Sequence, residues 1–321
     1  MTHHTLRLAA LACGLVTGLI PSAAPLGAQG AVELPAHELI FSRQASPDRT
    51  NYDVWRICGD GSQLASLLVM PGDQYQLAVA PDGRSFVYAS AVDGQMDIFR
   101  KSFGRGEPQN LTNHSANDGS PFFSPDGTRM GFFSNRDGGK AELYVLTLSD
   151  SSLRRLTTDT LHDGEGSWSP DGRHIRFTRF FPGAPDNSRP AAGEIMELEV
   201  ATGALRQLTA LGNGYNGGLS HSPDGRRLAF HRSSATGAEI WTMNADGSEA
   251  RAITRTKVDE YGPEWSPDGN WLAVTAGTGD LGGGRFDLWL LRPDGSERRL
   301  LAATENGESW HRWRTGEFTC R

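Results

Sequence analysis

The sequence predicts an all-β fold, a six-bladed β-propeller with four antiparallel strands in each blade, from two repeated features. An Ala- or Ser-Pro-Asp-Gly turn occurs five times, at 80–83, 124–127, 169–172, 222–225 and 266–269. These turns are 44, 45, 53 and 44 residues apart, and a decayed sixth copy fits at Trp313, 48 residues after Trp265. Each interval also contains short runs of alternating apolar and polar residues, which is the pattern of β-strands.

One unit illustrates the four predicted strands, named a to d in chain order. Strand a is "GPEW", which ends at Trp265 and leads into the turn. Strand b is "NWLAVTA", strand c is "FDLWLLR", and strand d is "ERRLLAA" after a second turn. Val, Ile, Leu and aromatic residues are enriched in these runs, and long helical stripes are absent, so the sequence favours sheets throughout.

The repeated turn has a structural explanation. Pro presets φ near −65°, Asp tolerates the bridge region, and Gly supplies the left-handed residue that returns the chain into a hairpin. The Ser hydroxyl is expected to brace the turn. No partner residue recurs with Asp171 and its equivalents, so we assign the turn a structural role and predict no catalytic residue.

The two ends of the chain are predicted to share one blade. Residues 38–68 supply strands b, c and d, and residues 308–313 supply a strand a. Such pairing closes a propeller without a free edge strand. Cys58 ends strand c of this blade and Cys320 follows its strand a, which suggests a disulfide in an oxidising compartment, with two free thiols as the alternative.

Composition and the N-terminus predict an exported protein. The chain has 321 residues and a formal net charge of −7, which argues against nucleic acid and anionic membranes as partners. Arg7 precedes an apolar run at 8–20 and then small residues, so residues 1–30 are predicted to be a signal peptide cleaved between Ala28 and Gly30. The mature segment 31–321 is expected to be a periplasmic or secreted monomer without a transmembrane segment.

The repeat resembles a known family. The pattern "WSPDG…LAF…IW.MNADGS…R.IT" is similar to the WD-like repeats of TolB-type six-bladed propellers, over about residues 37–317. The resemblance implies the propeller fold and an exported protein that binds a protein or peptide in the cell envelope. It implies less about function than about fold. We expect the propeller domain alone, without a hydrolase domain, because the sequence has no Gly-x-Ser-x-Gly elbow.

The loops between strands d and a, and between b and c, are long and varied, whereas the other turns are short. The loops 180–193 and 275–285 are the longest. Because binding residues concentrate on variable loops of a rigid scaffold, we expect a site on this d–a/b–c face, at the mouth of the central channel.

A polar residue recurs five positions before the Trp168 position of each unit. The six residues, here called the polar series, are Gln74, Asp118, Asp163, Asn216, Glu260 and Glu308. One hypothesis is a site for a cation or a basic peptide; the other is capping within each blade. The hairpin register predicts that they oppose Ser90, Ser134, Arg179, Arg232, Ala276 and Arg43 in that order. Asp118 and Glu260 then lack a facing cation and are the better candidates for ligand contacts.

Three further residues are candidates for a site on this face. His114 and His162 lie close in sequence to Asp118 and Asp163, which raises a divalent cation at the channel mouth as a hypothesis, although the spacing matches no metal motif. Trp310 stands three residues before Trp313, where the other units carry smaller side chains. It is predicted either to stack on a sugar or peptide or to fill the channel.

These observations support two functions. The leading one is an exported, non-catalytic propeller that binds a protein or peptide through the d–a/b–c face, without a cofactor. The alternative is a cation-assisted carbohydrate-active enzyme, a lyase or hydrolase, acting at the channel mouth. Binding of a divalent ion, or capture of a protein partner, discriminates between them.

Overall fold

A computed structural model describes residues 33–45, 51–92, 94–182, 192–212, 214–278, 285–303, 307–315 and 320. The predicted signal peptide and most of the two longest loops, 183–191 and 279–284, lie outside the described residues. The chain divides into residues 1–33 and 34–321, and the strands described here all belong to the second unit. All regular elements in the described ranges are strands, and these ranges contain no helix long and apolar enough to cross a membrane.

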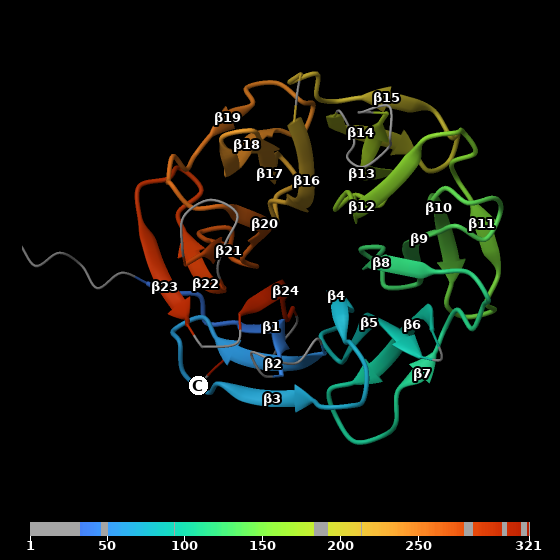
Figure 1. The fold of residues 1–321 in the computed structure, drawn as a ribbon, viewed down its shortest axis with the longest axis horizontal. Helices are drawn as coiled ribbons and strands as arrows, with labels where there is room; N and C mark the ends of the chain where they lie inside the picture. The colour runs from blue at the N-terminus through green and yellow to red at the C-terminus, as the bar shows by residue number, and fades with distance from the viewer. Residues whose placement is uncertain are drawn as a thin grey trace, which may run out of the picture. The chain divides into compact units, whose positions relative to one another are not determined.

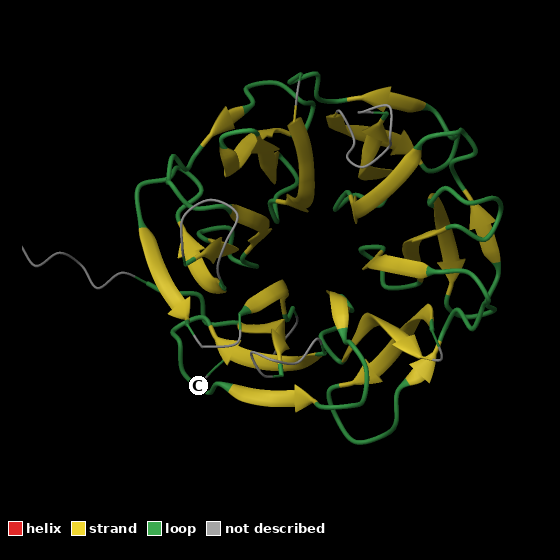
Figure 2. Ribbon diagram, in the orientation of Figure 1, coloured by secondary structure: helices red, strands yellow, loops and turns green. Residues whose placement is uncertain are grey.

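In these described ranges, twenty-four strands form four sheets of four strands and one sheet of eight (Figure 2). The first sheet has the order β24 (Glu308–Trp313), β1 (Glu38–Gln44), β2 (Tyr52–Cys58), β3 (Ala65–Leu68). The second is β4 (Tyr75–Val79), β5 (Ser85–Val92), β6 (Gln95–Ser102), β7 (Gln109–Asn110). The third is β8 (Asp118–Phe123), β9 (Arg129–Ser134), β10 (Glu142–Thr147), β11 (Leu153–Arg155). The fourth is β20 (Glu260–Trp265), β21 (Leu272–Gly277), β22 (Phe286–Leu291), β23 (Arg298–Ala302).

The eight-stranded sheet consists of two antiparallel groups of four. One group is β12 (His162–Trp168), β13 (His174–Phe181), β14 (Ala192–Glu199), β15 (Leu205–Gln207). The other is β16 (Gly214–His221), β17 (Arg227–Ser234), β18 (Gly237–Asn244), β19 (Arg251–Ala252). A short parallel pairing of Ala192 with Gly214 and of Gly193 with Tyr215 joins them. Each group therefore repeats the four-stranded order of the other sheets.

Each four-stranded group has one strand nearest the centre of the arrangement (Figure 1). These inner strands are β4, β8, β12, β16, β20 and β24. These inner strands contact one another in sequence, β4 with β8, β8 with β12, β12 with β16, β16 with β20, β20 with β24, and β24 with β4. β24 pairs antiparallel with β1, as the sequence predicts for the two ends of the chain. Cys58 and Cys320 form a disulfide beside this pairing.

The repeated turns lie at the end of each inner strand and have the predicted bracing. Ser124 Oγ donates a hydrogen bond to Asp126 at 2.5 Å and accepts one from the Arg129 N–H at 3.0 Å. The same contacts recur at Ser169, Ser222 and Ser266. Several turns also pack on their neighbours, since a Cβ placed on Gly127 would lie 3.5 Å from Pro81. The repeated side chains of these turns therefore brace the turns themselves and pack on neighbouring turns.

Apolar side chains fill the spaces between neighbouring sheets. Trp168 and Trp265 are buried there, and so is Trp313 of the decayed repeat. His221 takes the corresponding position in its unit, where it hydrogen-bonds Ser167 at 3.0 Å and Arg176 at 2.6 Å. Burial lowers the pKa of His221 to about 3, with Arg176 contributing, so this histidine is a neutral link between neighbouring groups of strands.

Candidate functional site

A cavity of about 570 Å³ lies among the inner strands. Each of the six inner strands contributes to its lining. Tyr52 and Phe286, which begin β2 and β22 after b–c loops, also line it, so the cavity lies toward the d–a/b–c face predicted from the sequence. The Pro-Asp-Gly turns, at the other end of the inner strands, do not contribute to it.

Six equivalent residues of the inner strands line this cavity. Each stands three residues before the Trp168 position of its unit, and each has a left-handed backbone with φ between 45° and 61°. We call them the left-handed series: Gln76, Ser120, Glu165, Gly218, Gly262 and Trp310. The strand pairing shifts register at this point in every inner strand, as in a β-bulge. Left-handed φ is uncommon for residues other than Gly, and such strain clusters at ligand sites.

Hydrogen bonds between neighbouring inner strands hold this series. The Ser120 N–H donates to Gln76 Oε1 at 2.8 Å, and the Gly218 N–H donates to Glu165 Oε2 at 2.6 Å. Because Gly218 has no side chain, His231 Nδ1 accepts instead from the Gly262 N–H at 3.4 Å. The bulge therefore turns backbone N–H groups sideways, toward the preceding strand.

Aromatic side chains form one wall of the cavity. Trp310 is 40% exposed, which is unusual for a large apolar residue. Its ring lies 5.5 Å from that of Tyr52 and 5.3 Å from that of Tyr75. Tyr261 and Phe286 line the neighbouring part of the wall, with ring centroids 5.6 Å apart. The two tyrosines therefore hold the Trp310 ring in place, and the exposed part of the ring is available to a ligand.

Glu165, Tyr215 and His231 form the polar wall of the cavity. Burial and the hydrogen-bonded Glu165 carboxylate raise the pKa of Tyr215 well above its usual value. Burial lowers the pKa of His231, although the Glu165 charge opposes this, so the imidazole is neutral at neutral pH. The carboxylate of Glu165 thus sits among neutral groups.

Arg312 and His311 complete the lining from β24. Arg312 Nη1 lies 3.8 Å from Glu264 Oε2 and donates a hydrogen bond to the His311 carbonyl at 2.8 Å. His311 Nε2 lies 2.9 Å from the Ala273 carbonyl, which makes this nitrogen the donor. Burial lowers the pKa of His311 to about 4, so it too is neutral at neutral pH.

The polar series lies two residues away along the same strands, and its predicted register is confirmed at five of its positions. Asp118 faces Ser134, Asp163 faces Arg179, Asn216 faces Arg232, Glu260 faces Ala276 and Glu308 faces Arg43. All six residues are between 0 and 1% exposed, and none lines the cavity.

The expected ion pairs within the series are present. Arg179 donates to both carboxylate oxygens of Asp163, at 2.8 and 2.9 Å, and Arg43 lies 3.6 Å from Glu308. Asp118 and Glu260 have no cation opposite them in the hairpin, as predicted, but each has an arginine partner from another segment. Arg136 reaches Asp118 at 2.8 Å, and Arg298 reaches Glu260 at 3.1 Å.

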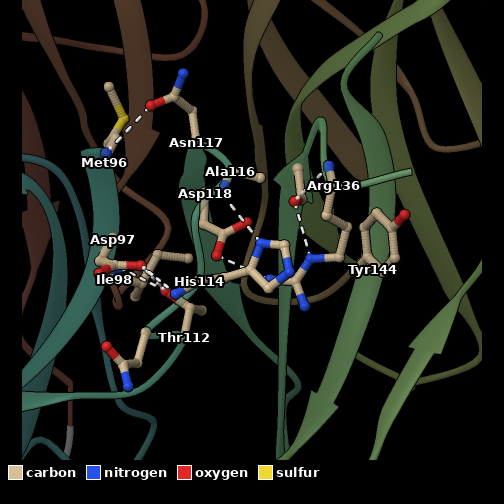
Figure 3. A network of polar contacts seen from close by, with 12 residues as sticks. Met96, Asp97, Ile98, Thr112, His114, Ala116, Asn117, Asp118, Arg136 and Tyr144 are labelled. Atoms are coloured by element: carbon tan, nitrogen blue, oxygen red, sulfur yellow. Dashed lines mark hydrogen bonds and ion pairs between the residues drawn. The ribbon is translucent and has the colours of Figure 1, made fainter. Parts of the chain in front are cut away.

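The register of the a–b hairpin gives only the facing residue, so it does not predict these two partners. Arg136 lies beyond the end of β9, and Arg298 comes from β23, so their long side chains reach the acids from outside that hairpin. Figure 3 shows Arg136 extended toward Asp118. These contacts support capping within each blade, and a role for the series in binding a partner stays a prediction.

His114 and His162 also lie away from the cavity lining. His114 Nδ1 accepts from the Ala116 N–H at 3.1 Å, while the backbone N–H of His114 donates to Asp97, which orders the loop before β8 (Figure 3). His162 Nδ1 accepts from the Ala141 N–H at 3.4 Å, and its ring packs on Phe180. Among the described residues, no three or more His, Cys, Asp or Glu side chains gather in a group that could hold a metal ion.

Known proteins show the same fold and repeat. The sequence profile of the TolB beta propeller domain matches residues 62–179. The Tol-Pal system protein TolB of Francisella tularensis subsp. mediasiatica is 31% identical over 201 residues, which are 60% of this chain and 43% of that protein. The crystal structure of TolB from Acinetobacter baumannii has a TM-score of 0.75 at 23% identity and covers 87% of this chain and 67% of the other. The chain carries a TolB-like β-propeller.

Solved structures similar to this chain also include an enzyme. An oligogalacturonate lyase in complex with manganese has a TM-score of 0.51 at 16% identity, with coverage of 85% of this chain and 75% of that one. Such a likeness shows a shared fold alone. The TolB-like chain spans less than half the length of the curated TolB relative.

The left-handed series is the part of this TolB-like propeller that sequence reasoning missed. Trp310 stood out because of its size, but the equivalent Glu165 and the two glycines did not. The repeat alignment carries no clear signal for the series, because the following column varies as much, for example from Leu77 to Pro121 to Gly166.

Proposed function

We propose that this protein is an exported, non-catalytic propeller that binds a protein or peptide of the cell envelope in the cavity among its inner strands. The observation that carries the proposal is the left-handed series. Four of its residues are not glycine and still have a left-handed φ, and their side chains line one cavity of about 570 Å³. Volumes of this size suit a ligand of several residues or a drug-sized molecule.

The proposal includes the architecture and location that surround this cavity. We infer six blades, with the pairing of β24 and β1 as the closure and the Cys58–Cys320 disulfide beside it. The disulfide supports an oxidising compartment such as the periplasm, in keeping with residues 1–30 as a cleaved signal peptide. The name of the TolB relatives, Tol-Pal system protein, supports a partner in the envelope.

The alternative, a cation-assisted lyase or hydrolase, has weaker support. Its structural relative shares only the fold at 16% identity. Its proposed ligands His114, Asp118, His162 and Asp163 do not line the cavity, and Asp118 and Asp163 each have an arginine partner.

Capture of a partner from a periplasmic extract of the source organism tests the proposal. The variant Trp310→Gln removes the exposed indole and keeps the backbone, because Gln76 has φ of 55° at the equivalent position. We expect wild-type protein to retain a partner and Trp310→Gln to lose most of it.

Leu300→Ala is the matched control for the loss of an exposed apolar side chain. Leu300 is 51% exposed on β23 and does not line the cavity. The Leu300→Ala variant should capture the partner as the wild type does. Equal capture by Trp310→Gln and wild type, with both folded, would place binding elsewhere and contradict the proposal.

A further inference from the structure

The left-handed series leaves one gap. Going around the inner strands, Trp310, Gln76, Ser120 and Glu165 carry side chains, whereas the next two strands carry Gly218 and Gly262. The gap lies between Glu165 on one side and Trp310 on the other. His231 and Tyr261 line the cavity behind it, since no series side chain covers them.

Glu165 borders this gap with an uncompensated charge. Its carboxylate accepts a hydrogen bond from the Gly218 N–H at 2.6 Å and interacts with the Tyr215 hydroxyl, both neutral groups. No ion pair of Glu165 occurs among the described residues. The cation in the lining, Arg312, has its own counter-ion in Glu264. All four acids of the polar series, by contrast, have an arginine partner.

We propose that the gap at Gly218 and Gly262 is a subsite for a basic side chain, Arg or Lys, of a bound peptide, with Glu165 as the residue that holds the cation. This inference rests on the proposed function, in which the cavity takes a peptide. It adds the chemistry that selects one.

The surroundings of the gap match such a side chain. A guanidinium or ammonium donates charge-assisted hydrogen bonds to a carboxylate, and these are stronger than neutral ones. The aliphatic stem and the cation both pack well on aromatic faces, which Tyr261, Phe286 and Trp310 supply on the side away from Glu165. A bare metal ion fits less well, because one carboxylate is far from the several ligands that divalent ions require.

The two glycines differ in what they tolerate. A Cβ on Gly218 would lie 2.7 Å from His231 Nδ1 and 2.9 Å from the Gly262 Cα, so a side chain there displaces backbone. A Cβ on Gly262 would meet only His311 Cε1, at an ordinary 3.8 Å. Gly262 has φ of 58°, close to the 55° of Gln76 in the same series. Gly262→Gln is therefore expected to fold and to fill the gap.

Isothermal titration with short peptides tests the subsite. The probes are blocked peptides, acetyl-Ala-Ala-Xaa-Ala-Ala-amide, in which Xaa is Arg, Lys or the neutral arginine analogue citrulline. A fourth probe is an all-Ala peptide with a free N-terminus. We expect the Arg and Lys peptides to bind at least about tenfold more tightly than the citrulline peptide, the factor for a net charged hydrogen bond of about 1.4 kcal/mol.

Two variants assign that preference to the gap. Glu165→Gln keeps an acceptor for the Gly218 N–H, and it should lower affinity for the Arg peptide about tenfold while leaving the citrulline peptide unchanged. Gly262→Gln should abolish binding of the Arg peptide. Gly172→Gln is the matched control, because Gly172 has φ of 70° with nothing within 4 Å of its Cβ position, at the opposite end of the strands. It should bind as the wild type does.

Equal affinity for Arg and citrulline peptides, or no effect of Glu165→Gln, would overturn the inference. So would preferential binding of the unblocked all-Ala peptide, which would assign the charge to an N-terminal ammonium. None of these results overturns the proposed function, because capture of a protein partner is measured separately, with Trp310→Gln and Leu300→Ala.

Discussion

The polar series and the left-handed series are two residues apart on the same six strands, and they have opposite environments. Residues of the first are almost fully buried, and each acid has an arginine within ion-pair distance. Residues of the second line a cavity, from a backbone conformation that L-residues rarely adopt. A single strand therefore carries both a buried residue and, two positions on at the β-bulge, a residue that lines the cavity.

The difference teaches that charge alone is a poor guide to a site in this fold. Asp163 and Glu165 are both acids of β12, but Asp163 pairs with Arg179, whereas the hydrogen-bond partners of Glu165 among the described residues are the neutral Gly218 N–H and Tyr215 hydroxyl. Removing one partner of a buried ion pair strongly destabilises a protein, because the other charge stays buried without a counter-ion. Replacing residues of the two series should therefore affect different properties.

The largest effect is expected for Arg179→Met. It leaves the carboxylate of Asp163 buried without its cation, and burial already raises the pKa of this group. We expect a loss of about 3–5 kcal/mol in the free energy of unfolding, measured by urea denaturation at pH 7. Glu165→Gln, two residues along from Asp163, should change it by less than about 1 kcal/mol. Similar losses in both variants would break the distinction between the series.

Removal of the disulfide should have a smaller effect, and on stability alone. Cys58 and Cys320 are 262 residues apart in sequence and belong to neither series. The double variant Cys58→Ser, Cys320→Ser should lose about 2–4 kcal/mol of stability, because the unfolded chain regains entropy. Binding of a partner in the cavity should be unchanged. Two free thiols in the wild-type protein, found by intact-mass measurement under denaturing conditions, would remove the basis for this prediction.

The smallest effect is expected at the turn end of the strands. A hydrogen bond from Ser124, with backbone and side-chain hydrogen bonds from Thr128, lowers the pKa of Asp126 from 3.8 to about 2. A carboxyl group with a lowered folded-state pKa stabilises the protein above its unfolded pKa, and this stabilisation is lost as pH falls toward 2. Asp126→Asn should therefore reduce the slope of stability against pH between about 4 and 2, in denaturation curves recorded across that range. An unchanged slope would show that the turn carries no proton-linked stability.

The sequence predicted those parts of the structure that repeat. The turns at Asp126 and its equivalents, the strands around them and the pairing of the chain ends all follow from local backbone chemistry and alternating burial. The register of the a–b hairpins was also predictable. A turn of fixed length sets which residues face each other, and the alternation of side chains along each strand allows only that pairing. Counting from the turns therefore placed Asp163 opposite Arg179.

The site was predicted less well, for physical reasons. Arg136 and Arg298 reach their acids through long side chains from other segments, and no register within one hairpin gives such contacts. The left-handed φ of Glu165 and Trp310 accompanies the register shift in their strands, and neither residue type indicates such a backbone in a sequence. Trp310 was singled out in advance only because its size made it stand out from its column.

Site-specific photo-crosslinking tests most directly whether partners enter the cavity and not the turn end. Tyr52 lines the cavity, and Arg173 is exposed beside a turn at the other end of the strands. Each is replaced by p-benzoylphenylalanine, and the protein is irradiated with the partner captured by the wild type. We expect a crosslink from position 52 that Trp310→Gln suppresses, and none from position 173. A crosslink from position 173 alone would contradict binding in the cavity.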